Sequence, residues 1–129
     1  MAKKTPRQIK LGTYALGCMR FTVYANLQNG ACFSVAGDGP GTMHIGVRGP
    51  WADAIAHILH EATEAVAMEL HLRYDAWPEF AHDSAGCLFV MNHEMFAEAV
   101  ARVGEFLVPV LPELAKAHKA LNRRQRRSG

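Results

Sequence analysis

The chain has 129 residues, of which 50% are hydrophobic and 20% are charged. This composition excludes an intrinsically disordered chain, and the length predicts a single domain over residues 1–129 that buries roughly two-thirds of the surface of its unfolded form. No run approaches the roughly 20 apolar residues of a membrane span, and no apolar secretory segment follows the basic start. We therefore expect a cytoplasmic protein without membrane contact.

The net charge of +2 conceals two basic ends around an acidic middle. Residues 1–10 hold four of the 14 basic residues and residues 116–129 hold six, whereas neither segment holds any of the 12 acidic ones. We expect flexible termini at about residues 1–10 and 122–129. The C-terminal tail has the composition of a segment that binds nucleic acid weakly and without sequence preference, although it lacks aromatic residues for base stacking. The alternative interpretation is a solubilising terminus.

Three segments in the first half of the chain alternate between apolar and polar residues, as half-buried strands do. They are residues 18–27, 31–36 and 42–48. Asn29-Gly30 supplies the two positive-φ positions of a tight hairpin between the first two strands, and a glycine-rich turn precedes the third. The sequence therefore predicts an antiparallel β-meander.

A long helix is predicted from about residue 51 to residue 73, because Gly49-Pro50 ends the third strand and suits a helix start. A long connection over residues 74–86 follows it, and the apolar run 87–91 fits a short buried strand. The order of these elements predicts an α+β fold, with helices covering one face of the sheet.

The C-terminal helical segment begins after Asn92, which we expect to cap it. Pro109 and Pro112 should break this helix, and a short further helix should then run into the basic tail. The apolar stripe of the segment consists of Phe96, Val100, Val103 and Leu107.

The predicted helix over residues 51–73 has an apolar face and a titratable face. At 100° per residue, His57, His60, Glu64 and His71 share one side, with Glu61 at its edge. The opposite side is the predicted core stripe, formed by Ile55, Ile58, Leu59, Ala62, Val66 and Leu70.

Residues 60–64, His-Glu-Ala-Thr-Glu, differ at one position from His-Glu-x-x-His, in which two histidines bind zinc and the glutamate is the base. The sequence resembles the zincin-type metallopeptidases in this helix and in the predicted hairpins before it. The resemblance covers five motif residues and a coarse topology. It implies His60 as the first metal ligand, Glu61 as the general base, and Glu64 in the place of the second histidine. A carboxylate ligand makes the ion a poorer Lewis acid and widens the choice from zinc to manganese or iron.

A third ligand has to come from another element. His93 is the first candidate, because it falls on the shoulder of the apolar stripe of its helix and should point inward. His82 in the long connection is the second candidate. The structural alternatives are a core histidine bonded to a backbone carbonyl at His93, a plain loop histidine at His82 and a solvated polar face at residues 57–71.

A second resemblance is to the all-α nucleotide pyrophosphohydrolases, whose Glu-x-x-Glu pairs bind magnesium. Glu61 and Glu64 supply one such pair, and Glu94 and Glu98 a looser one, although those enzymes lack leading strands. We expect a small metal-binding protein that hydrolyses peptide or amide bonds, with zinc as the favoured ion. The alternative is a non-enzymatic binding module, encoded by a phage or mobile element, that holds a protein or nucleic-acid partner.

Overall fold

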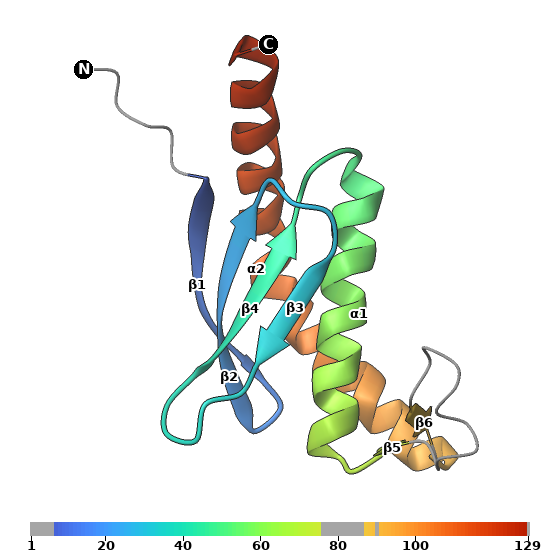
Figure 1. Cartoon of the computed structure of the whole chain (residues 1–129). Helices are drawn as coiled ribbons and strands as arrows, with labels where there is room; N and C mark the ends of the chain where they lie inside the picture. The colour runs from blue at the N-terminus through green and yellow to red at the C-terminus, as the bar shows by residue number, and fades with distance from the viewer. Residues whose placement is uncertain (1–6, 76–86, 90, 129) are drawn as a thin grey trace.

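The computed structural model describes residues 7–75, 87–89 and 91–128. These residues form a four-stranded sheet, a separate two-stranded sheet and two helices, so the predicted α+β class is confirmed. Both helices pack against the larger sheet around one core cluster (Figure 1). In chain order the elements are β1 (Gln8–Leu16), β2 (Met19–Asn26), β3 (Ala31–Ser34), β4 (Gly41–Gly46), α1 (Trp51–Glu69), β5 (Arg73–Asp75), β6 (Cys87–Phe89) and α2 (His93–Ser128).

The larger sheet is mixed, and its strand order is β1-β2-β4-β3. β1 pairs with β2 and β3 with β4 in antiparallel fashion, whereas β2 and β4 are parallel. The prediction of an antiparallel meander is therefore wrong, because β4 lies between β2 and β3. Gly30 does have a positive φ of 88°, but its turn joins two strands that do not pair, and its carbonyl accepts a hydrogen bond from Gly46 of β4 instead. A side chain at Gly46 would collide with the backbone carbonyls of Gln28 and Gly30, so glycine is needed there.

Strand β1 was not predicted from the sequence. The predicted flexible N-terminal segment reached residue 10, whereas β1 begins at Gln8. A β-bulge between Lys10 and Gly12 shifts the inward-facing positions by one residue, which obscures the period of two in the sequence.

Helix α1 begins at Trp51 as predicted and ends at Glu69, four residues before the predicted end. His71 has a left-handed φ of 56° and lies just beyond it. The helix is rotated relative to the predicted stripe, since Leu59 is 39% exposed while Glu61 is only 6% exposed. The buried residues of α1 are Ala54, Ile58, Glu61, Ala62, Ala65, Val66 and Ala67.

Helix α2 is continuous for 36 residues, so the predicted break at Pro109 and Pro112 is wrong. Its two halves run in different directions in Figure 1, as expected of a helix that keeps proline as a kink. Asn92 caps it as predicted, because its Oδ1 accepts a hydrogen bond of 2.8 Å from the Met95 N–H. The segment from residue 122, expected to be flexible, continues the helix to Ser128.

The core face of α2 begins later in the helix than the sequence suggested. Phe96 and Val100, predicted to lie in the stripe, are 54% and 55% exposed. The buried positions follow helical spacing from Val103 onward: Val103, Phe106, Val110, Leu114, Ala117 and Leu121. Neither described helix is long and apolar enough to cross a membrane.

Candidate metal site

Three of the predicted site residues come together on α1. Donor atoms of His60, Glu61 and Glu64 all lie within 4.8 Å of one another. His60 Nε2 and Glu64 Oε2 are 3.3 Å apart, because residues four apart in a helix lie one turn above each other. Ligands about 2.0–2.2 Å from one zinc ion are separated by roughly 3.5 Å, so small side-chain movements bring all three atoms into range.

The burial of the three side chains decreases from one side of the group to the other. Glu61 is 6% exposed, the side chain of Glu64 is 26% exposed and that of His60 is 67% exposed. A cation bound here would therefore have a buried carboxylate beneath it and an imidazole at the solvent boundary. Coordination positions on the solvent side would stay open to water, as they do in catalytic metal sites.

Glu61 is the unusual member of the group. Among the described residues none donates a hydrogen bond to its carboxylate. Burial raises the pKa of Glu61, and the neighbouring Glu64 raises it further, whereas His60 and His57 act in the opposite direction. Among the described residues, Glu69 Oε2 is the side-chain oxygen that is fully buried without a partner, whereas the Glu61 carboxylate is not fully enclosed. A divalent cation beside Glu61 would still compensate the charge that burial makes costly.

The other histidines of the predicted titratable face do not join the group. His57 is half-buried, and its Nδ1 lies 2.8 Å from the carbonyl oxygen of Gly46 at the end of β4. Because that oxygen can only accept, Nδ1 carries the proton and donates. His57 therefore ties α1 to the sheet, and His71 lies beyond the helix end.

Helix α2 contributes no ligand to the group. His93 is exposed at the first position of α2, so the prediction that it points inward is wrong. The described residues place no further histidine, cysteine or acidic residue with His60, Glu61 and Glu64. His82, the second candidate, lies outside the described residues. Glu61, predicted as the base, thus occupies the third position of the group.

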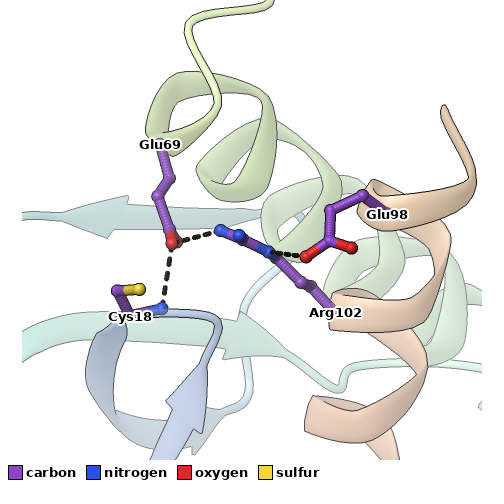
Figure 2. A network of polar contacts seen from close by, with 4 residues as sticks. All are labelled: Cys18, Glu69, Glu98 and Arg102. Atoms are coloured by element: carbon purple, nitrogen blue, oxygen red, sulfur yellow. Dashed lines mark hydrogen bonds and ion pairs between the residues drawn. The ribbon is translucent and has the colours of Figure 1, made fainter. Parts of the chain in front are cut away.

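A second polar cluster, which the sequence analysis missed, joins three elements (Figure 2). Glu69 at the end of α1 accepts a hydrogen bond of 2.9 Å from the backbone N–H of Cys18 and forms an ion pair with Arg102 of α2. Arg102 Nε also donates to Glu98 Oε1 at 2.9 Å. Only the spacing of Glu98 and Arg102 was visible in the sequence, because Glu69 lies 33 residues from Arg102 and 51 from Cys18.

The contacts of this cluster hold the fold together. Gly17, next to Cys18, has a φ of 64°, and a side chain there would come within 2.7 Å of the Glu69 carboxylate. The turn between β1 and β2 is therefore shaped to receive Glu69. Glu69 and Arg102 already bind each other. We therefore infer that these two residues hold α1, α2 and this turn together and take no part in a reaction.

Sequence comparison and structure comparison do not supply a function for the chain. No protein-family model, no curated protein and no solved structure matches it. The function has to be inferred from the residues of the chain itself.

Proposed function

We propose that the protein binds one divalent transition-metal ion through His60, Glu61 and Glu64 of α1. The observation that carries the proposal is the convergence of three donor groups within 4.8 Å of one another, one of them from Glu61, whose side chain is only 6% exposed. A carboxylate in that position destabilises the protein unless a cation or a proton neutralises it. A metal ion shared by three side chains of one helix face satisfies it.

The donor set supports a borderline transition metal. One imidazole and two carboxylates suit zinc, and they also suit manganese and iron. Zinc is our first choice because the spacing of His60 and Glu64 matches the helix motif of zinc hydrolases. Two carboxylates would reduce the charge of the site and hence the acidity of a bound water.

Hydrolysis of a peptide or amide bond is the reaction that we propose for the loaded site. In the zincin pattern a bound ion would supply an acidic water, and Glu61 would be the base beside it. The same residue is close enough to bind the ion. Because we propose Glu61 as a ligand, we expect Glu61→Gln to release the metal, whereas a residue that acted only as a base would keep it after this replacement.

The test is metal analysis of protein made without a histidine tag, equilibrated with zinc, manganese or iron and then dialysed. We expect about one ion per chain, lost in His60→Ala and in Glu64→Gln. His71→Asn is the matched control, because it removes a nearby histidine outside the group and asparagine tolerates the left-handed backbone. Metal-free protein with an unchanged fold would refute the proposal.

One further variant tests the ligand expected from α2. His93→Ala should retain the ion, since His93 is exposed and apart from the group. Loss of the ion in this variant would instead support the third ligand that the sequence suggested. The cytoplasmic location and the weak nucleic-acid contact of the basic tail stay predictions.

A further inference from the structure

The larger sheet has one face that no described helix covers (Figure 1). Alternate residues such as Phe21, Val23 and Met43 point to the core and are almost fully buried. The residues between them point the other way, because successive side chains of a strand alternate. We call this surface the open face. It consists of Gln8, Lys10, Thr13 and Ala15 of β1, Arg20, Thr22, Tyr24 and Asn26 of β2, Thr42 and His44 of β4, and Cys32 and Ser34 of β3.

The strand register arranges the middle of the open face as a row across all four strands. Lys10 is paired with Tyr24, Tyr24 with His44, and His44 with Cys32. The rings of Tyr24 and His44 are stacked, with centroids 5.1 Å apart and planes inclined by 12°. One face of each ring is covered by the other ring. Both residues are half-buried, and the outer sides of the stacked pair face Lys10 and Cys32, the next residues of the row.

A row of hydroxyl groups lies beside the aromatic row. Thr13 Oγ1 and Thr22 Oγ1 are 2.9 Å apart, and Ser34 Oγ and Thr42 Oγ1 are also 2.9 Å apart. Thr22 and Thr42 are paired in the register, so the row spans the sheet. Thr22 is buried, but Thr13 and Ser34 are exposed, and their hydroxyls can both donate and accept hydrogen bonds, which suits a ligand with sugar and phosphate oxygens.

The acidic residues are distributed unevenly over the fold. The strands β1 to β4 contain no acidic residue, and the open face carries the exposed cations Lys10 and Arg20. Of the 12 acidic residues, all except Asp38 lie at Asp53 or later in the chain. A polyanion on the open face would therefore meet Lys10 and Arg20 and no acidic residue of the strands, whereas α2 carries both acidic residues and the basic run 116–127.

We propose that the open face binds single-stranded nucleic acid. Bases stack on the outer sides of the Tyr24–His44 pair, and phosphates lie against Lys10 and Arg20. A flat sheet reaches bases only when they are not paired within a duplex, and aromatic stacking with flanking cations is the usual way of holding them. Large aliphatic side chains, which a protein partner would require, are absent from the open face as defined. The proposal does not depend on the metal site.

The experiment measures fluorescence anisotropy of a labelled homopolymeric oligonucleotide of about 16 nucleotides with the full chain at low salt. Tyr24→Leu should weaken binding about 5- to 150-fold, the range that corresponds to the stacking of one base. Tyr24→Phe keeps the ring and should bind as the unmodified protein does. A duplex of the same length should bind more weakly than the single strand.

Two variants that each remove one positive charge test whether the open face is the binding surface. Lys10→Ala should weaken binding and reduce its salt dependence, whereas Arg48→Ala, which removes the same charge from an exposed site between β4 and α1, should not. Both side chains are exposed, so both variants should fold. Equal effects of the two variants, equal affinity for duplex, or no binding at low salt would each overturn the proposal. So would a Tyr24→Leu variant that alters self-association of the free protein and leaves nucleic-acid affinity unchanged, because the open face would then be a dimer interface.

Discussion

Replacing Glu61 by glutamine should stabilise the metal-free protein and abolish its stabilisation by metal. Burial raises the pKa of Glu61 above its ordinary value of 4.5, so the folded protein binds this proton more tightly than the unfolded chain does. Below pH 4.5 Glu61 is protonated in both the folded and the unfolded protein, so its charge no longer affects the free energy of unfolding. As the pH rises past that value the unfolded chain ionises first, and the free energy of unfolding falls until the folded carboxyl ionises as well. Glutamine has nearly the same shape without the charge, so the variant should gain stability at neutral pH.

The two magnitudes can be worked out separately. The gain of the metal-free variant should be about 1 kcal/mol, the lower end of the roughly 1–3 kcal/mol cost of an unpaired buried polar group, because nearby imidazoles offset part of it. In the unmodified protein, a metal concentration about 100 times Kd adds about 2.7 kcal/mol. A chain of 129 residues has an unfolding entropy of about 0.27 kcal/mol/K, so that metal effect should raise Tm by about 10 °C.

The assay is thermal unfolding at pH 4 and pH 7, after chelation and again with added zinc or manganese. Glu105→Gln is the control, because it makes the same chemical change at an exposed position of α2 and should shift stability by less than about 0.5 kcal/mol. A Glu61→Gln variant that melts lower than the unmodified protein at pH 7, and that still responds to metal, would refute the reasoning. Glu61 would then be an ionised and satisfied part of the core.

Three further predictions concern the fold. Chelation should leave the far-ultraviolet dichroism unchanged, because the core of sheet and helices does not include the metal group; a collapse of the signal would show a structural ion. Arg102→Met should lower Tm, since it leaves the Glu69 carboxylate buried without a counterion, and adding Glu69→Gln should recover part of the loss; additive losses in calorimetry would contradict this coupling. Asn122→Ala should cost about 1–3 kcal/mol in denaturant unfolding, because Asn122 donates to the Val47 carbonyl at 2.8 Å and accepts from the Gly49 N–H at 3.4 Å. A chain truncated after residue 122 keeps these contacts and should be the more stable of the two.

The features predicted correctly from the sequence are those decided by neighbouring residues. Helix α1 begins at Trp51 because Pro50 suits the position before a helix, and α2 begins after Asn92 because its side chain caps the helix. The distance between His60 and Glu64 also depends on helix geometry alone. Each of these interactions spans at most four residues, so the sequence reports it directly.

The strand order and the continuity of α2 could not be predicted from neighbouring residues alone. Alternation of apolar residues in β2 and β3 shows which face of each strand is buried, but it does not show which strand lies beside it. The insertion of β4 depends on contacts such as that between Gly46 and Gly30, which are 16 residues apart. Pro109 and Pro112 remain inside a helix because the residues around them, Phe106, Val110 and Leu114, are fully buried against the sheet and α1. Tertiary packing there outweighs the lost hydrogen bonds.

The burial of Glu61 could not be read from the pattern of the helix either. The apolar residues of α1 predicted a stripe that includes Leu59, and the packed helix exposes Leu59 while it buries Glu61. Burying Glu61 in place of Leu59 costs stability. Proteins accept such a loss of stability most often where a function requires the residue. The low exposure of Glu61 beside the donor groups of His60 and Glu64 therefore supports a metal ion at α1 independently of the sequence motif, because a motif of five residues recurs by chance.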